Sequence, residues 1–154
     1  MTVFNDLGDL LRQEEGLVLT PTPDAKKTFT IGYGHQLTPK QLETIKTAQS
    51  LNPNSFTKEA AETLLRQDMI KAFADARSVV GTRLFNKLSG ARQKVLTSMA
   101  FQMGKGGLTS FKETLKFIKK GDFDNAGREM LDSKWARKQT PARAKRLSKM
   151  LTEG

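Results

Sequence analysis

The chain has no cysteine among its 154 residues. Disulfide bonds, thiolate metal sites and a cysteine nucleophile are therefore excluded. It holds a single histidine, His35, so a zinc site would need carboxylates around one imidazole, which is unusual. We expect neither a metal nor another cofactor. With one Trp and one Tyr, the chain also has few side chains on which nucleic-acid bases stack.

Long apolar runs, internal repeats and low-complexity linkers are also missing. The first residues, MTVFNDLGDLLRQEEG, have no basic start, and Asp6 and Asp9 interrupt their apolar pattern. We expect no signal peptide and no transmembrane segment. The length suits one compact domain, or two small lobes that share a core.

Positive charge is abundant. Lys and Arg number 26 against 16 Asp and Glu, a formal charge of +10. Such an excess favours an anionic partner: nucleic acid, anionic lipid or an acidic cell-wall polymer. Charge alone does not choose among these partners, and a basic surface with no dedicated partner stays open.

Apolar spacing predicts strands only before residue 57. Residues 3–13 have an amphipathic helical pattern with Gly16 as a C-cap, and β-prone runs on either side of PTPDAKK indicate a hairpin. Thr38 and Thr57 are predicted N-caps of helices over 39–49 and 57–80. We expect the apolar stripe of the second of these helices to contain Ala60, Leu64, Ile70 and Ala74.

The rest of the chain is predicted to be helical, with GKGG at 104–107 and Gly121 as separators. The fold class is therefore α+β: a small N-terminal lobe (about 14–56) with a β-hairpin, a connecting helix (57–80) and a helical C-terminal lobe. The C-terminal lobe would span 81–154 and include the N-terminal helix 3–13. Its expected helices are 84–88, 91–103, 110–119, 124–133 and 141–151.

Two carboxylates stand out by their surroundings. Glu15 ends an apolar-striped helix, where partial burial disfavours the charged form and helps the side chain keep a proton. Asp24 lies in a proline-flanked polar segment, where a carboxylate should stay ionised. One protonated acid and one charged base are the pair that glycosidic bond cleavage requires. Their nine-residue separation is weak support by itself, because most such pairs are surface charges.

Other readings of this region are weaker. His35 has no G-x-S-x-G nucleophile elbow to serve, and IGYGH lacks the G-K-[ST] ending of a phosphate-binding loop. We expect His35 to be structural and to pair with an acid of the 57–80 helix, for which Asp68 is the candidate. Most Lys and Arg of KWARKQTPARAKRLSK are interpreted as a solvated helix face.

The order of these residues resembles the lysozymes of T-even phages, glycoside hydrolase family 24. Glu15-Gly16, Asp24 nine positions on, Thr30 six further and the closing Gly32-Tyr33-Gly34-His35 all match the family's intervals. The segments TKEAAETLLRQD, AFQMG and QTPARAKR resemble the family's inter-lobe helix, central helix and C-terminal signature. The resemblance covers nearly the whole chain.

The resemblance implies a peptidoglycan-degrading endolysin, a muramidase that hydrolyses the β-1,4 bond between N-acetylmuramic acid and N-acetylglucosamine with inversion. It implies Glu15 as general acid, with Glu14 an exposed neighbour, Asp24 as the base that activates water, and Thr30 as the hydroxyl that helps hold that water. It places three supporting residues in the C-terminal lobe: Gln102 and Arg143 beside the catalytic glutamate, and Phe101 on the wall of the groove.

The expected partners are peptidoglycan and anionic cell-envelope surfaces, with no nucleic acid, and the protein is expected to be a monomer. It would be made in the host cytoplasm and reach the wall after a separate protein permeabilises the membrane. Pro21 and Pro23 depart from the family and should stiffen the loop bearing Asp24. The alternatives are a lytic transglycosylase on the same fold and a non-enzymatic basic protein that binds cell wall or nucleic acid.

Overall fold

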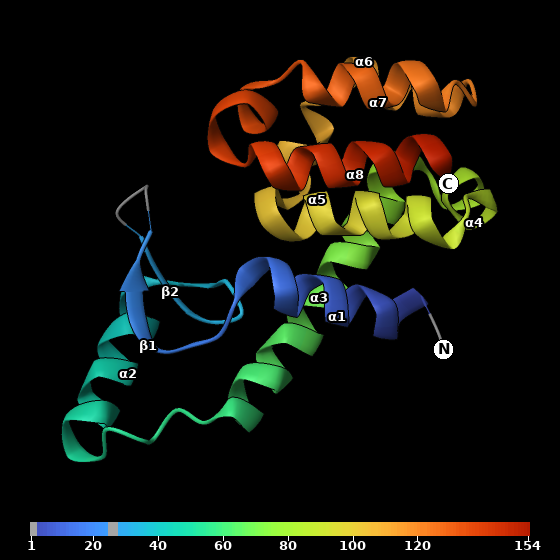
Figure 1. The fold of residues 1–154 in the computed structure, drawn as a ribbon. Helices are drawn as coiled ribbons and strands as arrows, with labels where there is room; N and C mark the ends of the chain where they lie inside the picture. The colour runs from blue at the N-terminus through green and yellow to red at the C-terminus, as the bar shows by residue number, and fades with distance from the viewer. Residues whose placement is uncertain (1–2, 25–27) are drawn as a thin grey trace. The chain divides into compact units, whose positions relative to one another are not determined.

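The computed structural model describes residues 3–24 and 28–154 of the chain (Figure 1). Contacts group Asn5–Met69 into one compact unit, called here the sheet unit. Ile70–Gly154, with the start of the first helix, form the other, called here the helical unit. The predicted α+β class is confirmed. The lobe boundaries inferred from the sequence stay a prediction.

The sheet unit begins with helix α1 (Val3–Glu15), which ends at the predicted glutamate. Gly16 follows with φ of 69° and donates its N–H to the Arg12 carbonyl at 3.0 Å, so it caps the helix as expected. Glycine adopts this left-handed conformation at little cost. The Glu-Gly pair therefore places Glu15 on the last turn of the helix.

The described residues contain an antiparallel sheet in the order β1-β2-β3. The sequence predicts the first hairpin but misses the third strand, whose three residues are too few to show a period. This strand pairs with β2 through a tight turn at Tyr33 and Gly34, and Gly34 has φ of 71°. The strands are β1 (Val18–Pro23), β2 (Phe29–Gly32) and β3 (His35–Leu37).

Pro21 and Pro23 lie inside β1 and not in the loop where the sequence suggested them. Strand β1 is at the edge of the sheet, and its register with β2 shifts between Val18 and Thr22. An edge strand with an irregular ladder tolerates proline, because the missing N–H is not needed for pairing. Residues 25–27 of the hairpin tip lie outside the described part.

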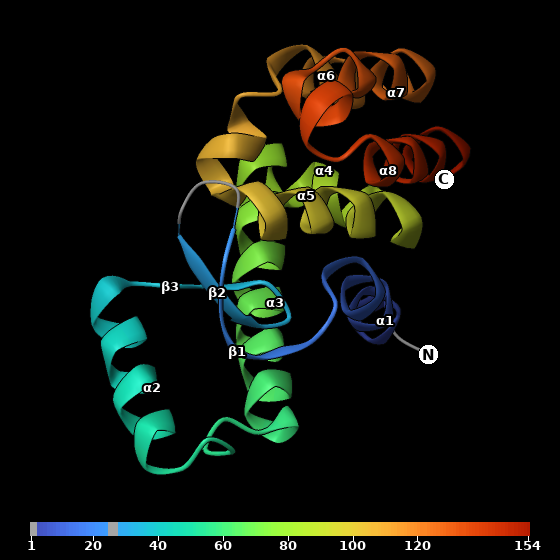
Figure 2. The same cartoon turned by 60° about the vertical axis from the view of Figure 1, so that its left-hand side comes forward.

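Helix α2 (Pro39–Leu51) follows with the predicted cap in full. Thr38 accepts from the Gln41 backbone at 3.2 Å, and the Gln41 side chain accepts from the Thr38 backbone at 2.9 Å. None of the described residues of α2 is buried. Figure 2 shows α2 and the first half of α3 on either side of the strands of this unit. Local capping thus supports a helix that buries little surface.

Helix α3 (Lys58–Val80) begins at the predicted cap, where Thr57 Oγ1 accepts from the Ala60 N–H at 3.1 Å. The predicted apolar stripe is wrong: Ile70 is 57% exposed and Ala74 is exposed. A different set of positions is buried instead, because helical spacing alone does not choose between neighbouring stripes. The buried residues are Ala61, Leu65, Met69, Ala72, Ala76 and Val80.

The helical unit contains the remaining helices. GKGG was predicted to separate two helices, and the break is present at its first residue: Gly104 has non-helical backbone angles, with φ of 77°, where two helical segments meet within α5. The five-residue π-helix η1 was not predicted. Met99, Met130 and Leu147 are among the fully buried side chains of the unit. Its elements are α4 (Thr82–Lys87), α5 (Gly90–Thr109), α6 (Lys112–Lys119), α7 (Phe123–Leu131), η1 (Trp135–Gln139) and α8 (Pro141–Glu153).

Candidate active site

Glu15 lies at the end of α1 with its carboxyl group against the turn between β2 and β3. A methyl group added to Gly34 would come within 2.5 Å of Glu15 Oε2 and 2.9 Å of its Cδ. Gly34 is therefore needed twice, for its left-handed backbone and for the room that it leaves. Glu14 and Glu15 are both half-buried, so the expectation that Glu14 is exposed is wrong, and exposure does not distinguish the two acids. The position of the Glu15 carboxyl against Gly34 distinguishes it from Glu14.

Asp24 directly follows β1 and is held by Thr28 on the other side of the hairpin. The Thr28 N–H donates to Asp24 Oδ1 at 3.0 Å, and the Thr28 hydroxyl donates to Asp24 Oδ2. The Asp24 N–H in turn donates to the Thr28 carbonyl at 2.7 Å. These bonds fix the orientation of the carboxylate within the sheet unit. The sequence predicted the aspartate but not its partner.

Thr30 lies on β2, half-buried, opposite Thr22. Its hydroxyl donates to the Thr22 carbonyl at 3.5 Å, a long bond that a better acceptor or a water molecule can replace. Of the two threonines after Asp24, Thr28 orients the carboxylate, whereas Thr30 has the weakly held hydroxyl.

His35 forms the predicted pair. Its Nδ1 lies 2.7 Å from Asp68 Oδ2, and the side chains are 20% and 28% exposed. The contact ties the first residue of β3 to α3, so a structural role for His35 is consistent with its geometry.

A second set of polar contacts joins α1, the turn and α3. Arg12 donates to both carboxylate oxygens of Glu62, with Nη2 2.7 Å from Oε2 and Nε 3.0 Å from Oε1. The Tyr33 hydroxyl donates to Glu62 Oε1 at 3.1 Å. The hydrogen bonds from Arg12 lower the pKa of Glu62. Burial, and then the hydrogen bond to Glu62, raise the pKa of Tyr33, so the phenol stays protonated as a donor.

No sequence pattern predicted this network. Arg12 and Glu62 are 50 residues apart, and no periodic pattern links them. One signal was present: Tyr33 is the only tyrosine and stands between the two glycines of the IGYGH motif.

The three predicted supporting residues lie in the helical unit. Gln102 Oε1 accepts from Trp135 Nε1 at 3.0 Å, and Trp135 meets Phe111 edge to face at 5.8 Å. Arg143 is 6% exposed, and its Nη2 lies 3.4 Å from Ser98 Oγ. Phe101 precedes Gln102 on α5 and is half-buried.

The sheet unit thus brings Glu15, Asp24, Thr30 and His35 into one compact group of elements, and the helical unit holds the rest. The roles of Phe101, Gln102 and Arg143 stay predictions.

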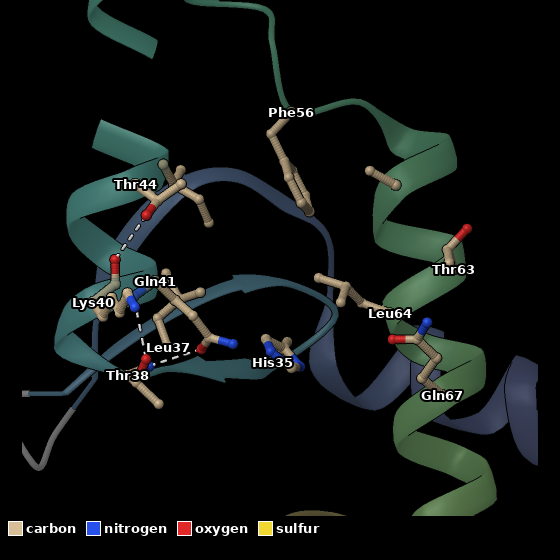
Figure 3. A pocket seen from close by; sticks show the side chains of 12 residues that line it. His35, Leu37, Thr38, Lys40, Gln41, Thr44, Phe56, Thr63, Leu64 and Gln67 are labelled. Atoms are coloured by element: carbon tan, nitrogen blue, oxygen red, sulfur yellow. Dashed lines mark hydrogen bonds between the residues drawn. The ribbon is translucent and has the colours of Figure 1, made fainter. Parts of the chain in front are cut away.

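A large pocket lies elsewhere in the sheet unit. Its volume is about 880 Å³, and it is an open pocket lined by residues of β3, α2, the α2–α3 connection and the start of α3. Figure 3 shows Phe56, Leu37 and Leu64 around it, with His35 at one side. Of the predicted site residues only His35 lines it, and it has no carboxylate among its lining residues. This lining lacks the acid and base pair predicted for the active site.

Two kinds of feature are absent from the described residues, 3–24 and 28–154. Among them, no cluster of three or more His, Cys, Asp or Glu side chains is arranged to hold a metal ion. Over the same residues, none of the helices combines the length and apolar character needed to cross a membrane.

Comparison with known proteins bears on most of the chain. A family model described as phage lysozyme matches residues 12–150. Two proteins of Dictyostelium discoideum named as probable T4-type lysozymes are 28% and 26% identical, each over 99% of this chain and 96% of its own length. The pre-baseplate central spike protein of Enterobacteria phage T4 is 31% identical over 96% of this chain. This chain spans only 28% of the spike protein's length.

Proposed function

Since the chain belongs to the phage lysozyme family, we propose that it is a muramidase that hydrolyses the β-1,4 bond between N-acetylmuramic acid and N-acetylglucosamine in peptidoglycan. The observation that carries the proposal is that one unit contains two carboxyl groups with different surroundings. Glu15 ends a helix against Gly34, and Asp24 is oriented by Thr28 at the hairpin. Both lie within the matched residues 12–150.

In the proposed reaction Glu15 is the general acid. Its proton goes to the glycosidic oxygen as the bond from that oxygen to the sugar C1 breaks, so the leaving sugar departs as a neutral alcohol. Asp24 is the general base, and it takes a proton from the water whose oxygen bonds to C1. The water adds one proton and one hydroxyl across the bond, and the carboxyl groups exchange their protonation states.

Thr30 helps hold the attacking water. The hydrogen bond from its hydroxyl to the Thr22 carbonyl is long, at 3.5 Å, so exchanging that bond for one to water costs little. Attack from the face opposite the leaving group gives inversion, which requires carboxyl groups roughly 6.5–9.5 Å apart so that a water fits between them.

The proposed setting is the bacterial envelope. The enzyme would be an endolysin made in the host cytoplasm, released to the wall by a separate membrane-permeabilising protein and active as a monomer in host lysis. The net charge of +10 would draw it to anionic envelope surfaces.

Analysis of the cleavage products tests this proposal. Purified peptidoglycan is digested with the protein, and the fragments are examined by mass spectrometry and for reducing ends. Hydrolysis predicts muramic acid ends of full mass. Anhydro ends, lighter by one water, would identify a lytic transglycosylase and overturn the proposal, and binding without cleavage would identify a wall-binding module. NMR of the first-formed anomer tests inversion.

A further inference from the structure

A chain of contacts links the last turn of α1, which carries Glu15, to the β2–β3 turn against which the Glu15 carboxyl lies. Arg12, on the same last turn of α1, binds Glu62 of α3 through both carboxylate oxygens, with Nη2 2.7 Å from Oε2. Glu62 accepts from the hydroxyl of Tyr33 at 3.1 Å. Tyr33 precedes Gly34, the residue against which the Glu15 carboxyl lies. The path thus leaves α1 at Arg12 and returns to α1 at Glu15.

The two contacts to Glu62 hold two separate sides of the Glu15 position. The ion pair pins the end of α1, where hydrogen bonds are otherwise incomplete and the last turn frays. The tyrosine bond pins the β2–β3 turn that forms the opposite wall. Tyr33 is 6% exposed, so its ring is packed and its hydroxyl has little freedom. Paired, doubly hydrogen-bonded Arg and carboxylate groups provide geometric specificity as well as energy.

We propose that Arg12, Tyr33 and Glu62 are positioning residues that hold the Glu15 carboxyl in its catalytic geometry. The proposal rests on the proposed function, in which Glu15 donates the proton. None of the three touches the reacting atoms in it. Each acts through the α1 end or through the Gly34 turn. Proton donation needs hydrogen-bond geometry, and a displacement of about 1 Å can cost about 100-fold in rate.

The experiment measures kcat and KM separately on soluble peptidoglycan fragments, well below the unfolding temperature of each variant. Glu62→Gln removes the charge that holds Arg12 and keeps the side-chain shape. We expect kcat to fall roughly tenfold, with KM within about twofold, because positioning a proton donor affects the chemical step and leaves ground-state binding intact. Tyr33→Phe removes one hydroxyl only, and we expect a fall in kcat of about threefold.

Two designs separate positioning from a general loss of stability. The matched control is Asp68→Asn, which breaks the 2.7 Å pair between the same helix and His35 but leaves the Arg12 network whole. It should lower the unfolding temperature while kcat stays within about twofold. Arg12→Lys should retain more kcat than Arg12→Met, because lysine keeps a cation near Glu62.

Coupling provides the last readout. If Arg12 and Glu62 act through one another, the double variant Arg12→Met/Glu62→Gln should be no slower than the slower single variant. If the double variant instead showed the product of the two single losses in kcat, Arg12 and Glu62 would act independently and the shared network would be contradicted. Wild-type kcat in Glu62→Gln and Tyr33→Phe, with Glu15→Gln inactive, would overturn the positioning proposal and leave the proposed function standing. An active Glu15→Gln would instead overturn the role of Glu15 on which the proposal rests.

Discussion

The two units of the molecule differ in how they use charge. Residues 1–69 contain 7 Lys and Arg and 9 Asp and Glu, whereas residues 70–154 contain 19 basic and 7 acidic side chains. The whole positive excess therefore comes from the helical unit. The sheet unit holds both candidate catalytic carboxyl groups.

The charges also differ in how they are held. In the sheet unit, ion pairs such as Arg12 with Glu62 and His35 with Asp68 join elements far apart in the sequence. In the helical unit, Lys71 with Asp75 and Arg137 with Asp132 join close neighbours. Acid and base chemistry needs a few groups in fixed geometry, but attraction to an anionic surface needs only many charges of one sign. Under the proposed function, the sheet unit would supply the first and the helical unit the second.

The largest effect should come from Glu15. In Glu15→Gln the side chain keeps its shape but has no proton to donate, and we expect kcat on peptidoglycan to fall by 10²–10⁴-fold. The matched control is Glu14→Gln, its half-buried neighbour on α1, which should remain within about twofold of wild type. Equal activity of the two variants would contradict the assignment of Glu15 in the sheet unit as the general acid.

A comparison of two left-handed glycines should give the next largest effect. Gly34→Ala meets the Glu15 carboxyl and strains the backbone, whereas Gly121→Ala in the helical unit, with φ of 74°, has nothing within 4 Å. Both variants should lose about 1–2 kcal/mol of unfolding free energy to backbone strain. Only Gly34→Ala should also lose activity, by about 10–100-fold, as measured on folded protein. Similar activity of the two would mean that the contact with Glu15 has no catalytic consequence.

Charge removal should give a smaller and salt-dependent effect. A triple variant, Lys138→Gln/Lys145→Gln/Lys149→Gln, removes three exposed charges from the helical unit. We expect lysis of permeabilised Gram-negative cells at low salt to slow by roughly tenfold, and the difference to shrink near physiological salt, where charges are screened within about 8 Å. The control is Lys40→Gln/Lys58→Gln/Arg66→Gln in the sheet unit. Equal slowing by the two sets would show that total charge, and not its location, matters.

The smallest effect concerns stability against pH. The pKa of Glu62 is lowered by its bonds to Arg12, so its stabilisation is present above the unfolded value of about 4.3 and lost as pH falls through the lower folded value. Glu62→Gln should therefore be less stable than wild type at pH 7, by no more than about 1 kcal/mol because solvent screens this partly exposed pair. The two curves should converge as the pH falls below the unfolded value and through the lower folded one. Urea unfolding at several pH values measures this, and a constant difference would exclude the ionised pair as its source.

Local rules predicted much of the fold. The caps at Thr38 and Thr57, the Gly16 stop and the first hairpin follow from side-chain chemistry within a few residues, and the structure has all of them. The misses depend on distant partners. Strand β3 is stabilised by β2 and not by its own pattern, and the buried stripe of α3 is chosen by what packs on it.

The candidate site divides in the same way. Glu15, Asp24 and Thr30 are spaced along one short segment, so the sequence could indicate them. The partners that orient them act through folding: Thr28 faces Asp24 only when the hairpin closes, and Glu62 reaches Arg12 from 50 residues away. A polar residue that orients another side chain through the fold cannot be identified from a local sequence pattern.

Helix α2 is attached to the molecule in an unusual way. None of its described residues is buried, the pocket of about 880 Å³ separates it from the start of α3, and its capping box lies at its own N-terminus. Contacts that bury little surface hold α2 to the strands: Gln49 Nε2 donates to the Leu19 carbonyl at 2.8 Å, and Lys46 Nζ lies 5.1 Å from the centre of the Phe29 ring. It should open as a small independent unit, and its amide hydrogens should exchange with solvent deuterium much faster than those of buried α5, without unfolding of the core.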